Sequence, residues 1–595
     1  MLPFCFGVAL LATALFAGPA GGAAPKGGTL RVDLRYDFDF VDPALADSPQ
    51  TRSVEHLTCT TLFDVSGAGL APDAAVSAPV VSADGRSYTI RLKSGLQYDT
   101  GDGITARDFA AAIGRVADPK LSSPGSAYTA AIASVRASST YTLRIRLKRP
   151  APDFASRLSS PFFCPLPPGT PHDPRGIVAP VPGSGPYYIA SWEKDRSLVL
   201  KRNRFYQGGK AANPDEIDLN VGISYALQQL RCEQDEADIC GFPPGNAAAL
   251  RKQYGVNRGR FFVKRHRTLY FLSINREQDL FRDNNQLARA VNLALDRPAI
   301  LRLNGSLGGT ATDQLLPRGI RGFHDWRLYP LNRANVRKAR QLARGHLRDR
   351  KCQLWSFNDG LGPGAAQTIQ LELEKIGLDC DVTLLDRSDL YRQAGARGAG
   401  YDLLLNSWDA QYPDPFDYLR LFDGREIRAR NNENLSYFEV ARVDRLLAAA
   451  AEKAGRARSR AYASLDRELM SRYAPVAPLF VSENTRVLVS SRVGCFTSKE
   501  IYGVDYGALC LDQQSAKLTV AVAGPGTVAS DPPGISCATS CSHDFTYGGL
   551  VILTARPAVG SDFVGWTGDC SGSSARCTVT MNGARDVHAV FRKKS

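Results

Sequence analysis

The stretch SADGRSYTIRLKSGLQYDTGDGITARDFAAAI, residues 82–113, is the part of this 595-residue chain that decides its fold class. Its first part alternates apolar and polar positions, with apolar residues at Tyr88, Ile90 and Leu92. A period of two is typical of a half-buried β-strand. Apolar residues then recur at helical spacing, at Phe109, Ile113 and Val116. Thr105 stands where an N-cap is expected, so a strand followed by a helix is predicted.

The same succession of strands and helices continues on both sides of this stretch. Strands are predicted at residues 29–35, 143–147, 198–201 and 217–221. Helices are predicted at residues 287–295, 365–376, 440–454 and 460–473, from apolar stripes at helical spacing. We expect Pro298 to end the first of these helices and Pro475 to end the last. Interleaved strands and helices predict the α/β fold class.

The composition changes from Lys517 onward, where Gly, Ser, Thr, Pro and Cys become frequent. Alternating apolar runs follow at residues 518–522, 551–555, 577–581 and 587–591. This pattern predicts a separate, small all-β module over residues 517–595. Because fewer than about 80 residues bury little core, disulfides are expected to matter for its stability.

The overall composition describes a folded, water-soluble chain. Apolar residues make up 44% and charged residues 22%, and the length exceeds what one hydrophobic core supports, so several lobes are expected. The formal net charge is +14, but the Lys and Arg residues are scattered among many carboxylates. This patterning predicts no nucleic-acid partner.

The first residues predict export. Residues 1–16 are largely apolar and residues 17–24 are small, so residues 1–24 are predicted to be a secretory signal peptide. The protein is then secreted, to the periplasm or the cell surface. Removing the signal leaves twelve cysteines, an even number in an oxidising compartment. Proximity in sequence favours these pairs, although sequence alone does not prove the connectivity: Cys59–Cys164, Cys232–Cys240, Cys352–Cys380, Cys495–Cys510, Cys537–Cys541 and Cys570–Cys577.

Motifs for catalysis are not found in the sequence. It contains no G-x-S-x-G elbow, no H-E-x-x-H and no Walker A loop. It also lacks C-x-x-C, and its histidines show no i, i+4 pairing, which argues against a structural zinc site. We therefore expect no enzyme activity, no cofactor and no metal.

Several segments, in the same order, carry a resemblance to a known family. They include GGTLRV at 27–32, residues 82–113, GSGPYYIASW at 183–192 and YDLLLNSWDAQYPDPFDYLRLF at 401–422. Together they resemble the extracellular solute-binding proteins of family 5, which deliver oligopeptides, dipeptides and nickel complexes to ABC importers. The resemblance extends from Gly27 to about Leu511.

The resemblance implies a three-lobed, periplasmic-binding-protein-like fold. Lobe I would comprise about 25–55, 182–260 and 478–511, lobe II about 56–181, and lobe III about 261–477. The lobes would close about a hinge around a small-molecule or peptide ligand, because a ligand that contacts both lobes only in the closed state shifts the equilibrium towards closure. The expected partner is an ABC permease, and a monomer is expected.

The resemblance also points to a ligand-contacting loop, with candidate residues Trp408, Asp409, Gln411, Tyr412 and Asp414. In oligopeptide binders, an aspartate three residues after the tryptophan pairs with the amino terminus of the ligand. Here that place holds Gln411, and a neutral amide cannot form this charge-assisted pair. Either Asp409 or Asp414 substitutes, or the ligand lacks a free amine. Trp408 and Tyr412 could stack on the ligand or fill core, and Asp414 could simply turn the chain.

The C-terminal module resembles the small β repeat domains appended to secreted bacterial proteins, through the runs GISC, FVGWTGDCSG and CTVTM that begin at residues 534, 563 and 577. Its role is then surface attachment or spacing, or it is an inert stabilised tail. Two functions other than transport stay open at this point. One is a surface adhesion, interaction or sensor protein with repurposed binding lobes, and the other is a secreted hydrolase.

Overall fold

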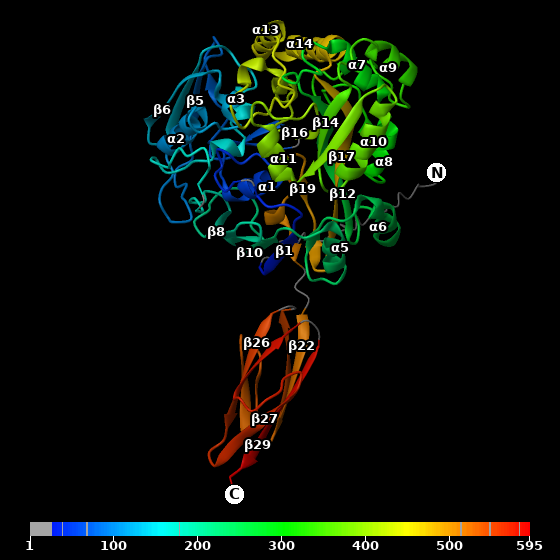
Figure 1. Ribbon diagram of the computed structural model, residues 1–595. Helices are drawn as coiled ribbons and strands as arrows, with labels where there is room; N and C mark the ends of the chain where they lie inside the picture. Colours follow the sequence, from blue (N-terminus) through cyan, green and yellow to red (C-terminus); the bar gives the residue numbers. More distant parts are fainter. Residues whose placement is uncertain are drawn as a thin grey trace, which may run out of the picture.

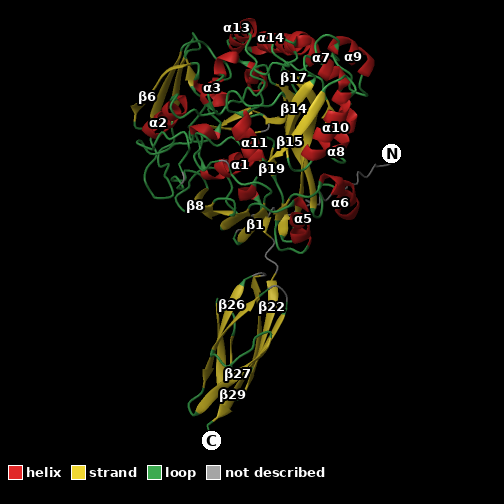
Figure 2. Cartoon of the chain, viewed as in Figure 1, coloured by secondary structure: helices red, strands yellow, loops and turns green. Residues whose placement is uncertain are grey.

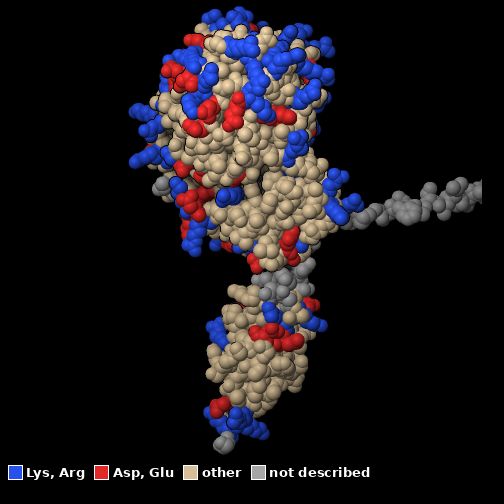
Figure 3. Space-filling model, turned by 45° about the vertical axis from the view of Figure 1, so that its right-hand side comes forward, with Lys and Arg blue, Asp and Glu red and all other residues tan. Residues whose placement is uncertain are grey.

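The chain folds into an α/β body, and the C-terminal β module extends from it (Figures 1 and 2). A computed structural model describes residues 27–594 except 39, 67–68, 178, 512–514, 547–548 and 582–583. The predicted signal peptide lies outside the described residues. Figure 3 shows Lys and Arg side chains spread over the body and interspersed with Asp and Glu, as the scattered charges of the sequence predict.

An eleven-stranded sheet forms the centre of the body. Its strands follow one another in this order: β15 (Asp379–Leu385), β14 (Lys351–Phe357), β16 (Leu403–Asp409), β12 (Phe261–Ile274), β17 (Val476–Val489), β11 (Ile239–Cys240), β1 (Thr29–Asp33), β10 (Glu216–Asn220), β9 (Ser197–Arg202) and β8 (Tyr187–Glu193), with β13 (Thr310–Ala311) paired to β17. Parallel pairs occur in both halves, β14 with β15 and β16 in one, and β1 with β10 and β11 in the other.

Two long antiparallel strands, β12 and β17, join the halves of this sheet. Residues 261–265 of β12 pair with residues 484–488 of β17, next to the β11 and β1 half. Residues 268–273 pair with residues 476–482 and lie beside β16. The register shifts between Arg265 and Thr268. This irregularity leaves the ladder locally disrupted where the two halves meet.

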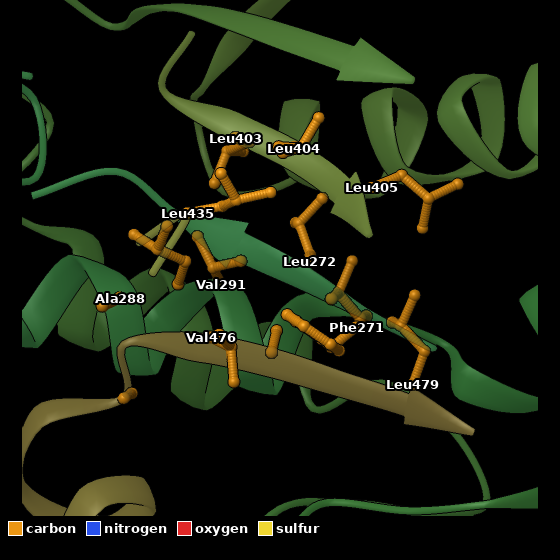
Figure 4. Close-up of a cluster of buried hydrophobic side chains, with 14 of the residues drawn as sticks. Phe271, Leu272, Ala288, Val291, Leu403, Leu404, Leu405, Leu435, Val476 and Leu479 are labelled. Carbon is orange, nitrogen blue, oxygen red and sulfur yellow. The ribbon is translucent and has the colours of Figure 1, made fainter. Parts of the chain in front are cut away.

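The largest hydrophobic core lies around β12, β16 and β17 (Figure 4). The strands contribute Phe271, Leu272, Leu403, Leu404, Leu405, Val476 and Leu479, and helix α7 (Asn285–Ala294) adds Ala288 and Val291. These residues are at most 3% exposed. Burial of this apolar surface stabilises the half of the sheet that carries the predicted ligand loop.

A second sheet contains the stretch that decided the fold class. It has the order β4 (Val80–Val81), β5 (Ser87–Arg91), β7 (Thr142–Leu147) and β6 (Ile132–Ser139). Helix α2 (Ala106–Ala117) packs near it, and Thr105 caps this helix as predicted. Asp108 accepts hydrogen bonds from both the backbone and the hydroxyl of Thr105, at 2.9 and 2.7 Å, which completes a capping box.

The helices predicted at residues 365–376, 440–454 and 460–473 are present, further helices occur that were not predicted, and one prediction needs correction. The other α-helices are α1 (Pro49–Thr58), α3 (Ser126–Thr129), α4 (Phe154–Arg157), α5 (Tyr225–Glu233), α6 (Ala247–Tyr254), α8 (Arg297–Leu303), α9 (Val336–Ala343), α10 (Gly362–Glu374), α11 (Arg387–Ala394), α12 (Pro415–Leu419), α13 (Ala441–Ala451) and α14 (Gly455–Glu468). The prediction that Pro298 ends a helix is wrong. Helix α7 ends earlier, Asp296 caps α8, and Pro298 lies in the first turn of α8, where its missing N–H costs nothing.

Several short elements complete the body. The two-stranded pairs are β2 (Phe63–Ser66) with β3 (Gly69–Pro72), β18 (Val493–Cys495) with β21 (Cys510–Leu511), and β19 (Ser498–Lys499) with β20 (Gly503–Val504). Helix α14 continues into a π-helical turn, Leu469–Tyr473, and Ala474 follows it in the left-handed conformation at φ 47°. Pro475 comes next, as expected for a residue that cannot continue the helix.

The C-terminal module consists of two four-stranded sheets. One has the order β25 (Ser540–Thr546), β22 (Ser515–Ala523), β29 (Arg585–Lys593) and β27 (Ser561–Gly568), and the other β24 (Ser536–Cys537), β23 (Gly526–Asp531), β26 (Leu550–Pro557) and β28 (Arg576–Thr580). Leu518, Val520, Leu553, Met581 and Ala589 are fully buried in its own core. All six predicted cysteine pairs are disulfide-bonded.

Candidate ligand-binding site

The predicted ligand loop begins at the end of β16 and continues to the cap of α12. Within β16, Asp409 lies opposite Thr268 and Trp408 lies opposite Leu269. Because side chains alternate along a strand, Asp409 and Trp408 point to opposite faces of the sheet. Directly after the strand, Gln411 and Tyr412 are only 1% exposed. The loop is therefore folded into the body.

Asp409 takes part in a hydrogen-bonded group at the junction of the two halves of the sheet. Its carboxylate bonds to Nε2 of His266 at 2.9 Å and accepts from the Thr268 hydroxyl. Burial alone would raise the pKa of Asp409, but the hydrogen bond and charge of His266 outweigh it, and the pKa is lowered. Asp409 is therefore ionised and paired within the protein.

Gln411 is held by two carboxylates. Its backbone N–H donates to Asp417 at 2.6 Å, and its Nε2 donates to Asp47 at 2.8 Å. Its Oε1 is buried and has no hydrogen-bond partner among the described residues, and the same holds for Nε1 of Trp408. Buried polar atoms are rarely left unpaired, so these two atoms have hydrogen-bonding capacity that the described residues do not use.

Tyr412 and Asp414 make contacts with other parts of the protein. The Tyr412 hydroxyl donates to Asp153 at 2.6 Å, and Asp414 forms an ion pair with Arg458 at 2.7 Å. Burial and the charge of Asp153 raise the pKa of Asp414, against the effect of Arg458. A small cavity of about 230 Å³ adjoins both residues. Their contribution to ligand binding stays a prediction, as does that of Trp408, Asp409 and Gln411.

The structure brings together a second group that the sequence reasoning missed. We call it the tyrosine–arginine cluster, and its members are Arg35, Tyr36, Tyr225, Tyr270, Arg387, Tyr391 and Arg486. All of these side chains are half-buried. The Arg387 guanidinium lies 5.3 Å from the Tyr36 ring and 3.7 Å from that of Phe357. The charges of Arg387 and Arg486 act to lower the pKa of both the Tyr225 and the Tyr270 phenol.

The ends of parallel strands position much of this cluster. Arg35 and Tyr36 follow β1, Tyr225 follows β10 and Arg387 follows β15, each at the carboxyl end of its strand. Open α/β sheets bind ligands outside the carboxyl ends of their strands. Tyr270 lies opposite Ser407 on β16, on the same face of the sheet as Asp409. The cluster and the predicted loop are therefore neighbours.

The cluster contains tyrosine hydroxyl groups that make no hydrogen bond within the described protein. Within the described residues, the hydroxyls of Tyr36, Tyr225, Tyr270 and Tyr391 make no hydrogen bond to protein, and that of Tyr36 is buried. Burial raises the pKa of the Tyr225 and Tyr270 phenols, against the nearby charge of Arg387. They are neutral donors at physiological pH. Phenol rings and unpaired hydroxyls on one surface suit a polar solute.

Two signals in the sequence could have indicated this cluster. Arg387 and Tyr391 stand four residues apart on a helix and so lie on one face. Arg35 is the last residue of the strand predicted at residues 29–35 and Tyr36 follows it, at a strand end where ligand contacts gather. Arg486, in the middle of a long strand, carries no such signal. Its place in the cluster depends on the pairing of β12 with β17.

Comparisons with known proteins agree with the observed fold. Residues 69–428, more than half of the chain, match the bacterial extracellular solute-binding proteins, family 5 middle region, and residues 517–595 match the divergent InlB B-repeat domain. Within the described residues, no helix is both long and apolar enough to cross a membrane.

Individual relatives support the same assignment. The glutathione-binding protein GsiB of Escherichia coli O1:K1 is 23% identical over 67% of this chain and 78% of its own length. The probable deoxycholate-binding periplasmic protein YgiS of E. coli K12 is 24% identical over 68% and 78%. The periplasmic binding protein DppA of Helicobacter pylori, solved with the peptide STSA, has the same fold, with a TM-score of 0.72, 21% identity and coverage of 82% and 98%. The predicted three-lobed, periplasmic-binding-protein-like fold with a small all-β domain is confirmed, and this chain belongs to the bacterial extracellular solute-binding proteins of family 5.

Proposed function

We propose that this protein is the extracytoplasmic substrate-binding component of an ABC importer. It captures a peptide or a similar small polar solute by hinged closure and presents the solute to a membrane permease. The observation that carries the proposal is the tyrosine–arginine cluster, where four hydroxyls without protein partners meet at the strand ends. The relatives are solute-binding proteins and not enzymes, which supports a role without catalysis.

The cluster is divided between the two lobes that would close. In the lobe boundaries proposed from the sequence, Arg35, Tyr36, Tyr225 and Arg486 belong to lobe I, and Tyr270, Arg387 and Tyr391 belong to lobe III. A solute bonded to both sets would be held by both lobes only in the closed state, so its binding favours closure. The register shift between Arg265 and Thr268 is the proposed hinge, since a disrupted ladder absorbs backbone rotation at little cost.

Ligand-dependent stabilisation tests the proposal. A solute that binds the folded protein at 100 times its Kd should stabilise it by about 2.7 kcal/mol. Purified protein should be analysed by mass spectrometry for a co-purifying solute and screened by thermal shift against short peptides and small polar solutes. The expected result is a melting temperature that rises with the concentration of at least one solute. No shift across the library, together with no co-purifying solute, would overturn the proposal.

Single hydroxyl deletions locate the site. Tyr225→Phe and Tyr270→Phe should each weaken binding of the solute about three- to tenfold, because each removes one hydrogen bond. Tyr141→Phe is the matched control, since Tyr141 is 40% exposed and lies in the turn between β6 and β7, outside the cluster. Unchanged affinity in both cluster variants would place the site elsewhere.

The membrane partner and the location need separate tests. We propose that the mature protein is a monomer in the periplasm or at the cell surface, after removal of residues 1–24. The N-terminal sequence of the secreted protein and light scattering after size exclusion check both statements. Crosslinking in the ligand-bound state should capture an ABC permease subunit.

A second candidate function is favoured by the C-terminal module. Residues 517–595 match the divergent InlB B-repeat domain, which supports a secreted surface adhesion, interaction or sensor protein with repurposed lobes. Deleting the module discriminates the two functions. Solute uptake that is lost when the whole gene is deleted, and restored by a chain without residues 517–595, favours transport. Uptake that is unchanged when the whole gene is deleted, with surface attachment lost on removal of residues 517–595, favours adhesion.

A further inference from the structure

The tyrosine–arginine cluster contains more positive charge than the protein itself neutralises. Arg387 is paired with Asp359, whose two oxygens lie 3.3 Å from its nitrogens. Arg35 makes no ion pair or hydrogen bond through its guanidinium within the described residues. Among the described residues, Arg486 bonds only neutral acceptors, the carbonyls of Asn304 and Ser306 at 2.6 and 3.1 Å and the Asn304 side-chain oxygen at 3.1 Å.

The positive charge at Arg486 is correspondingly costly in the unliganded protein. Burial lowers the pKa of Arg486, and the Tyr270 and Tyr225 phenols of the cluster oppose this without outweighing it. By contrast, Arg387 has a counter-ion, because the charge of Asp359 outweighs burial and raises its pKa. Three guanidinium groups thus share one carboxylate. A half-buried guanidinium without a counter-ion is a strong binding group for an oxyanion, which it can bond through two N–H groups at once.

The neighbouring carboxylates do not offer a complementary place for a cation. Asp409 is paired with His266, Asp414 with Arg458, and Asp417 with Arg420. Asp47 accepts from Gln411. The buried polar atoms without a hydrogen-bond partner among the described residues include Oε1 of Gln411, which is neutral, and Nε1 of Trp408 and Nε of Arg52, which are donors. A solute ammonium ion would therefore find none of these four carboxylates unpaired. Asp386, beside the cluster, makes no ion pair within the described residues, but it is exposed and accepts hydrogen bonds from Ser388 as the cap of α11.

We propose that the solute is an anion without a free ammonium group, whose carboxylate or phosphate oxygens are bound by Arg35 and Arg486. The tyrosine hydroxyls of the cluster donate to the same or adjacent oxygens, and a neutral N–H or O–H of the solute donates to Gln411. This inference rests on the proposed function and specifies the chemical class of its solute.

The test uses full-length mature protein and a library of matched solutes. Each set contains a short peptide acid with a free amine, its N-acetylated acid, its N-acetylated amide and its free-amine amide, and further arms contain amine-free organic acids and phosphate esters. Binding is measured by thermal shift and then by calorimetry. We expect stabilisation to concentrate in amine-free anions, with the carboxylate and phosphate arms distinguishing the two kinds of oxyanion.

The outcomes separate this inference from the proposed function. Binding that is confined to zwitterions, cations or neutral solutes, or that is equal for free-amine and N-acetylated acids, would overturn the inference and leave the proposed function standing. No binding by any arm, with no co-purifying solute, would overturn both.

Charge-deletion variants then locate the oxyanion. For the best anionic solute, Arg35→Gln and Arg486→Gln should each raise Kd at least about tenfold. Arg337→Gln, an exposed arginine on α9, should leave Kd unchanged. Arg35→Gln is the cleaner variant because it breaks no hydrogen bond or ion pair within the described residues and removes only the contact with the Tyr36 ring, so its unliganded melting temperature should lie close to that of the wild type. An equal loss of affinity for the anion and for its neutral amide would show that Arg35 and Arg486 do not recognise the charge of the solute. This result would contradict the proposal.

Discussion

The contacts of Gln411 explain why its position holds an uncharged side chain. Its Nε2 donates to Asp47 and its backbone N–H donates to Asp417. A carboxylate at the same position would face the carboxylate of Asp47 in a site that is only 1% exposed. Like charges at such a distance cannot both ionise without a large cost. The amide is therefore part of how the end of β16 packs against the segment before α1.

Gln411→Glu should destabilise the protein at neutral pH. The substitution keeps the length of the side chain but replaces a donor with a charge, and we expect a loss of about 2 kcal/mol or more at pH 7. The loss should shrink near pH 4, where a protonated carboxyl can donate to Asp47 again. Chemical unfolding at the two pH values measures this. Gln253→Glu, at an exposed position, is the control and should stay within about 0.5 kcal/mol.

His266 should make stability depend on pH above neutrality. Burial alone would lower its pKa, but the hydrogen bond and charge of Asp409 and the hydrogen bond that the ring donates to the Glu500 carbonyl raise it above 6.5, while Arg52 opposes them. A raised histidine pKa means that the stabilisation is fully present below 6.5 and is lost as pH rises through the folded-state pKa. The lowered pKa of Asp409 means that its share is present above 3.8 and is lost as pH falls through its own pKa.

His266→Gln therefore should lose most stability between these limits. The difference in unfolding free energy between wild type and variant should be largest near pH 5 to 6 and should decline towards pH 9. His56, which is buried and has a lowered pKa, destabilises the fold as pH falls below 6.5, but it is present in both proteins and cancels from the difference. A difference that is flat from pH 5 to 9 would contradict the charged His266–Asp409 pair.

At the scale of elements, α12 and the short helix Arg420–Phe422 join two parts of the body through buried charges. The Arg420 guanidinium bonds Asp417 at 3.1 Å, both oxygens of Glu433, and the Tyr128 hydroxyl at 2.8 Å. Tyr128 belongs to α3 and donates to Asp417 in turn. Arg420 is 4% exposed and Asp417 is fully buried. This network connects the loop after β16 with the proposed lobe II.

Removing the cation of this network should be severe. Arg420→Leu leaves Asp417 and Glu433 without their partner, and a buried charge stripped of its partner typically costs about 3–5 kcal/mol. Arg442→Leu is the matched control, because Arg442 pairs with Glu468 at the surface, where such pairs contribute about 1 kcal/mol or less. Equal effects of the two variants on the free energy of unfolding would show that the buried network contributes no more than a surface pair.

Elements that depend on residues close together in the sequence could be predicted from it. Elements that depend on contacts with distant residues could not. The strand β5 and the capped helix α2 follow from a period of two, a period of 3.6 and the Thr105 cap, all within one stretch. Pro298 was assigned to the wrong end of a helix, because proline fits a first turn as well as it ends a helix. The π-helical turn Leu469–Tyr473 also has no sequence signal that we recognise.

The candidate site shows the same division. The loop 408–414 could be indicated by resemblance, but its contacts to Asp47, Asp153 and His266 come from residues far away in the chain. The tyrosine–arginine cluster is assembled from five separate segments. Periodicity within one segment carries no information about which other segments it will meet.

At the scale of the whole molecule, the C-terminal module has its own core and its own two disulfides. These bridges close loops of 4 and 7 residues, which corresponds to about 2 kcal/mol each if they act by restricting the unfolded chain. For a module of this size, that is a large part of the stability available.

Reduction should therefore unfold the module before the body. With a reductant, limited proteolysis should cleave first within residues 515–594, and calorimetry should show the module's transition move to lower temperature ahead of the body's. A Cys570→Ser, Cys577→Ser double variant should reproduce part of this shift without reductant. First cleavage within residues 29–511 under reducing conditions would contradict the expectation.

The order of strands in the large sheet limits how early the chain can fold during its synthesis. Strand β17, near the end of the body, is the only neighbour that β11 and β12 share in the sheet order. A polypeptide that leaves the ribosome from its N-terminus must wait for residues 476–489 before these edges are covered. Unpaired edges and long-range pairing favour slow maturation and aggregation. Nascent chains of this protein should accordingly need a holding chaperone until translation has passed that point.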